Sequence, residues 1–299
     1  MKILNFGSLN IDHVYQVERF VQPGETTAAK DLHLFAGGKG LNQSVALAAA
    51  GGTVFHAGAV GEDGAFLIEL LQSRGVDTSL IRTLDTPTGH AVIQVDASGQ
   101  NCILLYGGAN QGISQTQITE TLAQFQKGDL LLLQNEINGN QLLIEQAYEA
   151  GLEIALNPSP MDARIHSLPL EKVSWFLLNQ VEGGEMTGET DPERILSALA
   201  RRWSRSRTVL TLGKRGAMVW DGDRIHRHGI YATPVVDTTG AGDTFTGYFL
   251  SSLARGLPVD ECLELASKAA AIAVSSAGAA ESIPTFDQVI HANLAYKEP

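Results

Sequence analysis

Two aspartates bracket a glycine-rich segment toward the C-terminus, Asp237-Thr238-Thr239-Gly240-Ala241-Gly242-Asp243-Thr244-Phe245. Apolar side chains then recur at every fourth position, which predicts a helix whose first turn is Ala241 to Thr244; they are Phe245, Phe249 and Leu253. Gly240 and Gly242 allow a tight turn with uncovered N–H groups, and a helix N-terminus carries partial positive charge. The segment is therefore typical of a site that binds a phosphoryl group.

Each aspartate has two interpretations. Asp243 is either an ordinary acid in the first turn of a helix or a general base. As a base it takes a proton from a substrate hydroxyl while that hydroxyl attacks phosphorus. Asp237 either caps the turn through its own backbone or, if it is buried, needs a partner of opposite charge.

A second group of polar residues follows the first predicted strand, Ile3 to Gly7. Asn10 and Asp12 come directly after it, where ligands collect in open α/β sheets, although an ordinary polar loop is an equal alternative. Further on, the segment 37–40 contains three glycines and opens a helix. One or two glycines suffice for a turn, so three indicate a ligand close to bare backbone.

Both glycine-rich segments resemble the signatures of the ribokinase-like (PfkB) carbohydrate kinases. The C-terminal one is the segment described above, and Gly37-Gly38-Lys39-Gly40-Leu41-Asn42-Gln43 resembles the N-terminal one. They occur in the family's order with its other landmarks between them, so the resemblance covers essentially the whole chain. It is strongest to the ribose-phosphorylating members. It implies an enzyme that uses ATP and Mg²⁺ to phosphorylate a free sugar hydroxyl, with ribose 5-phosphate as the first expected product.

The chain between the signatures alternates apolar strands with helical patterns, which predicts a doubly wound, mainly parallel sheet flanked by helices. Strands are expected at 53–60, 129–134, 153–156, 174–178 and 207–212, and helices at 64–74 and 116–125. We expect one kinase domain over 1–299. A small β-sheet lid is expected at about 12–36 and 88–107, the second part being a hairpin that turns at Asp96 to Gly99. Its apolar face needs a cover, either the sugar or the lid of a second subunit, so we expect a homodimer.

The resemblance also assigns roles to single residues. Asp243 is the expected base, with the N–H groups of Gly240, Ala241 and Gly242 as an anion hole. The expected sugar contacts, besides Asp243, are Asn10, Asp12, Gly38, Lys39, Gly40, Asn42 and Glu136. On spacing alone, a surface glutamate is a more common explanation of Glu136 than a sugar contact.

On the nucleotide side, Asn179-Gln180-Val181-Glu182 resembles the motif that orders Mg²⁺ and its waters. Leu178 replaces a common proline and Gly183-Gly184 follows the motif, so we expect the next helix to begin late. The positions expected against the nucleotide are Thr211, Gly213, Gly216 and Gly242. Lys214 and Arg215 either reach phosphate or are simply solvated.

A monovalent cation such as K⁺ is also implied, with Asp237 as one ligand. The other expected ligands are the carbonyls of Thr239, Ala273, Ser276 and Gly278 and the hydroxyl of Ser282. All of them offer oxygen, which hard cations require.

Composition excludes several classes of protein. The 299 residues are 44% hydrophobic and carry 21 Lys and Arg against 33 Asp and Glu, a formal charge of −12. This balance argues against binding to nucleic acid or anionic lipid. The two cysteines, Cys102 and Cys262, have no metal-ligand spacing and favour a reduced, cytoplasmic protein. The first apolar run is too short for a signal peptide, and none is long enough to cross a bilayer; the alanine-rich stretch 266–280 is expected to be a buried helix.

Other functions stay open at this point. A phosphosugar kinase needs cations for its substrate's phosphate, and only Lys39 lies near the sugar motifs. A nucleoside kinase needs an apolar slot for the base, which Phe35, His90 and Tyr106 could form. A fructokinase differs only in pocket shape. A non-catalytic sugar- or nucleotide-binding regulator is also compatible with the fold, but it has no chemical need for Asp243 beside an intact glycine turn.

Overall fold

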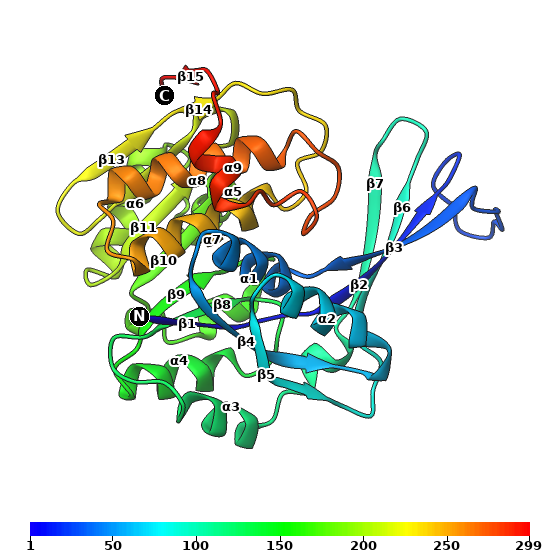
Figure 1. The fold of residues 1–299 in the computed structure, drawn as a ribbon, viewed down its shortest axis with the longest axis horizontal. Helices are drawn as coiled ribbons and strands as arrows, with labels where there is room; N and C mark the ends of the chain where they lie inside the picture. The colour runs from blue at the N-terminus through cyan, green and yellow to red at the C-terminus, as the bar shows by residue number, and fades with distance from the viewer.

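A nine-stranded sheet runs through the centre of the protein (Figure 1). The computed structural model describes residues 1–299. The strand order is β13-β12-β11-β10-β9-β8-β1-β4-β5; every pairing from β5 to β11 is parallel, and β12 alone runs antiparallel to its two neighbours, β11 and β13. The strands are β1 (Lys2–Phe6), β4 (Thr53–Val60), β5 (Asp77–Thr83), β8 (Leu130–Gln134), β9 (Glu153–Asn157), β10 (Trp175–Asn179), β11 (Arg207–Thr211), β12 (Ala217–Trp220) and β13 (Ile225–His228). The predicted doubly wound, mainly parallel sheet is confirmed.

Helices cover both faces of this sheet (Figure 1). One face carries α1 (Lys39–Ala49), α2 (Ala65–Ser73), α7 (Ala241–Ala254), α8 (Val259–Ala273) and α9 (Phe286–His291). The other carries α3 (Gln115–Leu122), α4 (Asn140–Glu149), α5 (Gln180–Thr187) and α6 (Pro192–Arg202). Successive strand residues enter opposite cores, as Ile3 and Leu4 do, so a buried strand such as Leu130–Leu133 is apolar throughout.

Two predicted helix boundaries are wrong. The helix after Asn179 does not begin late, because Asn179 and Glu182 form a reciprocal capping box that starts α5 at Gln180. The alanine-rich stretch is helical only as far as Ala273. Val274 is the C-cap of α8, and turns and bends follow it up to Gly278, which has a positive φ of 93°.

A separate four-stranded sheet forms the predicted lid, which projects from the main body (Figure 1). Its order is β3-β2-β6-β7, with β3 (Asp31–Gly37), β2 (Asn10–Gln16), β6 (Gly89–Val95) and β7 (Asn101–Tyr106). The expected turn between β6 and β7 is present, and the N–H of Gly99 donates to the carbonyl of Asp96 at 2.9 Å. Residues 17–30 contain no strand, so strands occupy only the two ends of the expected segment.

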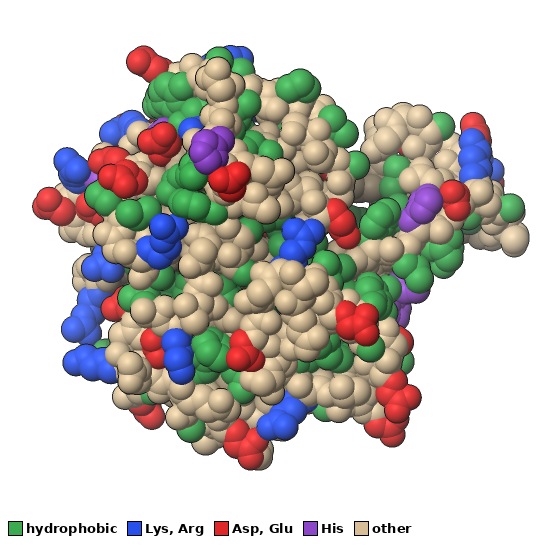
Figure 2. Space-filling model, viewed as in Figure 1, with side chains coloured by type: hydrophobic (Ala, Val, Ile, Leu, Met, Phe, Trp, Pro, Cys, Tyr) green, Lys and Arg blue, Asp and Glu red, His purple; other side chains and the backbone are tan.

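The register of the lid decides which side chains share a face. Asp12 lies beside Phe35 and Ala91, and Ala91 lies beside Leu105, so these four side chains occupy one face. The opposite face carries His13, Leu34, Val92 and Leu104, together with His90 and Tyr106, which pair with each other. Both faces expose large apolar side chains, and Figure 2 shows hydrophobic side chains along the side of the lid that faces the viewer.

Two short strands complete the fold, β14 (Ile230–Tyr231) and β15 (Tyr296–Lys297), which pair with each other near the C-terminus. None of the helices combines the length and hydrophobicity needed to cross a lipid bilayer.

Candidate active site

A cavity of about 170 Å³ opens where the carboxyl ends of β9, β10 and β11 meet the N-termini of α1 and α7. This is the position at which ligands bind in open α/β sheets. Residues expected for sugar, Mg²⁺, nucleotide and phosphoryl contacts meet here although they are far apart in the sequence. The lining comprises Lys39, Asn157, Ser159, Leu177, Leu178, Asn179, Glu182, Val209, Thr211, Gly240, Gly242, Asp243, Phe245 and Thr246.

The N-terminus of α7 presents free amides to this cavity. Gly240 adopts the left-handed region with φ of 73°, and a Cβ there would lie 3.1 Å from the Cα of Ala279. The N–H of Ala241 donates to the carbonyl of Thr238 at 3.3 Å. Contrary to the expectation, this N–H is therefore not free to bind an anion. The N–H groups of Gly240, Gly242 and Asp243 have no acceptor within the protein.

Two amide side chains of α1 hold the carboxylate of Asp243. Gln43 donates through Nε2 to Oδ1 at 2.8 Å, and Asn42 donates through Nδ2 to Oδ2 at 3.1 Å. Asp243 is buried, and burial raises its pKa although Lys39, Gln43 and Asn42 favour the ionised form. A carboxylate with a raised pKa and fixed orientation is suited to accept a proton.

Lys39 lies among several carboxylates. Burial lowers the pKa of its ammonium, but Asp243, Glu136 and Glu182 more than offset this, so the pKa is raised and the group stays charged. Glu136 is the acceptor for the backbone N–H of Lys39 at 2.9 Å and for the hydroxyl of Ser8. It is therefore part of the site and is not a surface glutamate.

The carboxylate of Asp12 has no hydrogen-bond partner within the protein. Burial, and then the charges of Glu136 and Glu281, raise the pKa of Asp12 to about 7. Gly37 lies so close that a Cβ there would be 2.2 Å from the carboxylate, so a larger residue would require Asp12 to move. Both oxygens of Asp12 are thus available to a ligand.

The amide side chains of Asn10 and Asn42 differ in which hydrogen-bonding group remains unpaired. Asn10 uses its oxygen to accept from Nδ2 of Asn110 at 2.7 Å, which leaves its amino group free. Asn42 is the reverse, because its Nδ2 is bound to Asp243 while its buried oxygen has no partner. The two side chains can therefore supply one donor and one acceptor to a polyhydroxylated ligand.

On the far side of the cavity, β10 and β11 end side by side, with Asn179 paired to Thr211. The capping box uses Oε2 of Glu182, bonded to the N–H of Asn179 at 2.9 Å, and leaves Oε1 free. Gly216 has a structural reason to be glycine, since a Cβ would lie 2.0 Å from the carbonyl of His228. Arg215 uses one N–H group, on Nη2, to donate to the side-chain oxygen of Gln180.

Asp237 joins the two loops that carry the expected cation ligands. Its Oδ1 accepts from the N–H and hydroxyl of Thr239 at 2.9 and 2.7 Å, and its Oδ2 accepts from the N–H of Gly278 at 3.1 Å. Ser282, also expected as a ligand, donates its hydroxyl to the carbonyl of Ala279 at 2.9 Å. No cluster of three His, Cys, Asp or Glu side chains could hold a metal. A cation here would depend mainly on carbonyl oxygens.

Several residues of the site were missed in the sequence. They are Ser8, Gln43, Asn110, Gln134, Asn157 and Ser159. Asn157 and Ser159 could have been found, because they follow a predicted strand at the same edge as the others. Gln43 and Gln134 carry no such signal, since their roles depend on contacts with distant residues.

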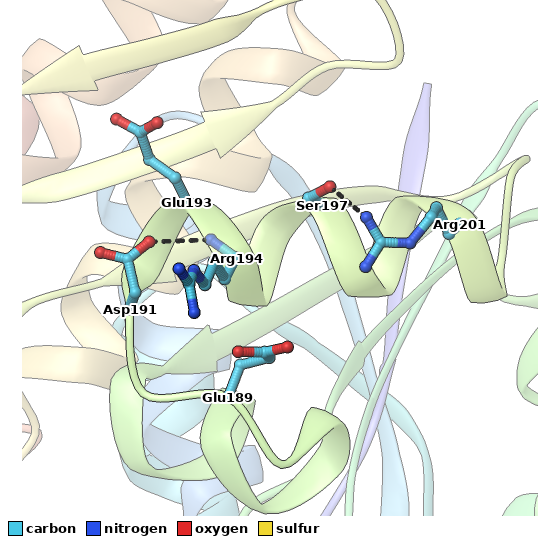
Figure 3. A pocket seen from close by; sticks show the side chains of 6 residues that line it. All are labelled: Glu189, Asp191, Glu193, Arg194, Ser197 and Arg201. Carbon is cyan, nitrogen blue, oxygen red and sulfur yellow. Dashed lines mark hydrogen bonds between the residues drawn. The ribbon is translucent and has the colours of Figure 1, made fainter.

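A larger hollow of about 550 Å³ lies over the surface of α6, away from these residues (Figure 3). Its six lining residues are all polar or charged, and the contacts that Figure 3 marks are local to α6. Asp191 caps that helix at the N–H of Arg194, and Arg201 donates to the hydroxyl of Ser197. The expected site residues contribute nothing to this hollow.

Comparison with known proteins agrees with the fold. The family model of pfkB family carbohydrate kinases matches residues 1–286. The chain is 33% identical to a ribokinase of Haemophilus influenzae, over 95% of both chains. Its structure is similar to that of an Arabidopsis thaliana ribokinase complexed with ribose and ATP, with TM-score 0.87 and 32% identity over 97% of both chains. A Cryptococcus neoformans ribokinase in complex with ADP has TM-score 0.85 and 33% identity, over 97% of this chain and 98% of that one.

The doubly wound sheet, the β-sheet lid and the cavity between two glycine-rich helix starts together define a class of protein, the carbohydrate kinases. The chain belongs to the pfkB family of carbohydrate kinases.

Proposed function

We propose that this protein transfers the γ-phosphate of ATP to a free hydroxyl of ribose, giving ribose 5-phosphate. The observation that carries the proposal is the meeting of Asp243, the free amides of α7 and Lys39 in one cavity. The similarity over the full chain to ribokinases, one of them with ribose and ATP, supports ribose as the acceptor.

Asp243 is the general base in this proposal. It accepts the proton of the sugar hydroxyl as that oxygen attacks the γ-phosphorus. The free N–H groups of Gly240, Gly242 and Asp243 then donate to the transferred phosphoryl group, together with the partial positive charge of the α7 N-terminus. Lys39 adds a full positive charge beside the same cavity.

The sugar is held by groups that have hydrogen-bonding capacity to spare. Asp12 accepts from two hydroxyls, Asn42 accepts from one through its free oxygen, and Asn10 donates through its free amino group. Glu136 completes the set by fixing the backbone N–H of Lys39, so that Gly38 and Gly40 keep the chain close to the sugar. The lid sheet carries Asp12, and its closure would exclude water, the competing acceptor.

The nucleotide occupies the side of the cavity formed by the ends of β10 and β11. Thr211 and Gly213 lie on the loop against it, and Gly216 shapes that loop. Asn179 and the free Oε1 of Glu182 would hold the waters of Mg²⁺, which neutralises phosphate charge when bound. The free carboxylate oxygen of Glu182 is an acceptor that fits the waters of a hydrated, hard cation.

A monovalent cation is proposed near Asp237, with the carbonyls of Thr239, Ala273, Ser276 and Gly278 and the hydroxyl of Ser282. The fit is supported by the hydrogen bonds that the N–H groups of Thr239 and Gly278 donate to Asp237, which hold the two ligand-bearing loops together. Such a cation would stiffen the turn that begins α7.

A homodimer through the lids is proposed because the lid exposes apolar side chains on both faces. Leu34 and Leu104 on one face are 57% and 71% exposed, and Ile103 and Leu105 on the other are 56% and 48% exposed. A second lid would remove this area from water.

The register of the lid argues against the nucleoside alternative. Of the three side chains considered for a base slot, only Phe35 shares the face of Asp12, while His90 and Tyr106 lie on the other face. An aromatic sandwich for a base is therefore not assembled above the sugar residues.

The test is an assay of ADP release with ATP, Mg²⁺ and separate acceptors: ribose, deoxyribose, fructose and nucleosides. Ribose should give the highest kcat/KM. A preference for a nucleoside or hexose would overturn ribose but keep the kinase, whereas binding of sugar and ATP without ADP release would identify a non-catalytic regulator.

A further inference from the structure

A chain of buried amide side chains leads from the core of the protein to the carboxylate of Asp243. Gln43 donates through Nε2 to Asp243 at 2.8 Å and accepts through Oε1 from Nε2 of Gln134 at 2.7 Å. The same Nε2 of Gln134 donates to Oδ1 of Asn5 at 2.9 Å. Asn5, Gln43 and Gln134 are fully buried, so no water competes for these contacts.

The orientation of every amide in this chain is determined by its neighbour. The end of Asn5 that lies 2.7 Å from the carbonyl of Gly40 must be the amino group, because a carbonyl only accepts. The oxygen of Asn5 therefore faces Gln134, which must offer its amino group. That group also faces Gln43, so Gln43 must present its oxygen to Gln134 and its amino group to Asp243.

At the end of the hydrogen-bonded amides that is remote from Asp243, the neighbouring groups are uncharged and are compatible with these donor and acceptor orientations. Asn5 also donates to the hydroxyl of Ser44 at 2.8 Å, and Ser44 lies 2.7 Å from Nδ1 of His56. Burial lowers the pKa of His56 to about 4, so its ring carries no charge at neutral pH. In either tautomer of the neutral ring, the hydroxyl oxygen of Ser44 keeps a lone pair that accepts from Asn5.

We propose that Gln43 and Gln134 are positioning residues for Asp243, and that the fixed carbonyl of Gly40 sets their orientation through Asn5. Gln43 holds one oxygen of the carboxylate directly, and Gln134 acts through Gln43 by preventing its amide from turning over. A turned amide would present its oxygen to a carboxylate, which is repulsive. The inference rests on the proposed role of Asp243 as the base.

The test compares Gln43→Met, Gln134→Met and the double variant, because methionine keeps an unbranched side chain but cannot donate. Ser251→Ala is the matched control, since Ser251 is buried on α7 and its hydroxyl has no partner. Each variant is assayed for kcat and for both KM values across pH, after circular dichroism and a melting curve have shown that it is folded.

Gln43→Met should lower the plateau kcat by about tenfold or more, as expected for a lost hydrogen bond to a charged group, with little change in either KM. The acid limb of its pH profile should move to higher pH, because Asp243 loses a donor while Lys39 and Glu136, the charged groups around it, remain. Gln134→Met should lower kcat by about two- to tenfold. It should add almost nothing in the Gln43→Met background, because it acts through Gln43.

If the loss of kcat in the double variant is the product of the losses in the two single variants, Gln134 does not act through Gln43 and its proposed role is overturned. An unchanged plateau kcat in folded Gln43→Met would overturn the role of Gln43. If Gln43→Met does not fold, the proposal is tested with Gln134→Met alone, by its plateau kcat and by the position of the acid limb in its pH profile. A wild-type protein without sugar kinase activity would instead refute the proposed function itself.

Discussion

Asn42 on α1 donates a hydrogen bond to Asp243 on α7 at 3.1 Å, so the two glycine-rich segments of the chain meet at a single carboxylate. The helix start that carries the expected sugar contacts is thereby linked to the helix start that carries the expected phosphoryl contacts. Closing the site around the sugar and placing the base are, for this reason, properties of one connected structure.

Asp243→Asn should lower kcat by about 10²- to 10⁴-fold, the usual effect of removing a general base. An amide also has only one acceptor, so Asn42 or Gln43 must then face a donor, and the melting temperature should change as well. Steady-state kinetics and calorimetric binding of ribose and ATP measure the two effects. Glu261→Gln, a first-turn acid of α8, is the control; near-normal turnover in folded Asp243→Asn would mean that Asp243 is only a helix cap.

The affinity for sugar should depend on pH through Asp12. Because burial raises its pKa to about 7, Asp12 is largely protonated at pH 6 and ionised at pH 8, and only the ionised form presents two charged acceptor oxygens to the sugar. KM for sugar should therefore fall as the pH rises through about 7, while KM for ATP changes little. Asp12→Asn should raise KM for sugar and remove this pH dependence; a KM that keeps the same pH dependence in the variant would assign it to another group.

Potassium should raise the activity several-fold relative to a bulky organic cation at equal ionic strength. The reason is that a cation bound by carbonyl oxygens near Asp237 pre-orders the turn whose amides meet the phosphoryl group. Asp237→Ala should abolish the response, because it removes both the charge and the hydrogen bonds to Thr239 and Gly278. Equal rates in the two buffers would show that the wild-type protein has no functional cation site.

Leu104→Lys should convert a dimer into a monomer. Leu104 is 71% exposed on the lid, so a lysine there has little effect on the fold of one subunit but places a charge in the proposed lid contact. Small-angle scattering at micromolar concentration measures the size, with Ile290→Lys on α9 as the control for an exposed apolar position outside the lid. A monomeric wild-type protein would defeat the dimer.

Local sequence patterns determined the main elements of this protein. The strand Leu130–Leu133 and the helix that carries Phe245 and Phe249 were predicted in place, because burial on two faces or on one stripe leaves a periodic trace in the residues themselves. The glycine-rich starts of α1 and α7 were recognisable for a similar reason, since bare backbone at a helix N-terminus requires glycine at particular positions.

Tertiary structure decided what depends on pairs of residues far apart in the chain. The strand register of the lid placed His90 and Tyr106 on the face opposite Asp12, and a shift of one residue would have reversed this without changing the hydrophobic pattern. The orientation of Gln43 toward Asp243 depends on the amide of Gln134. The sequence gives no signal of this role, because the residue type alone does not show whether a glutamine is buried or exposed. Hydrogen-bond partners are selected by distance in space, and only the folded chain specifies those distances.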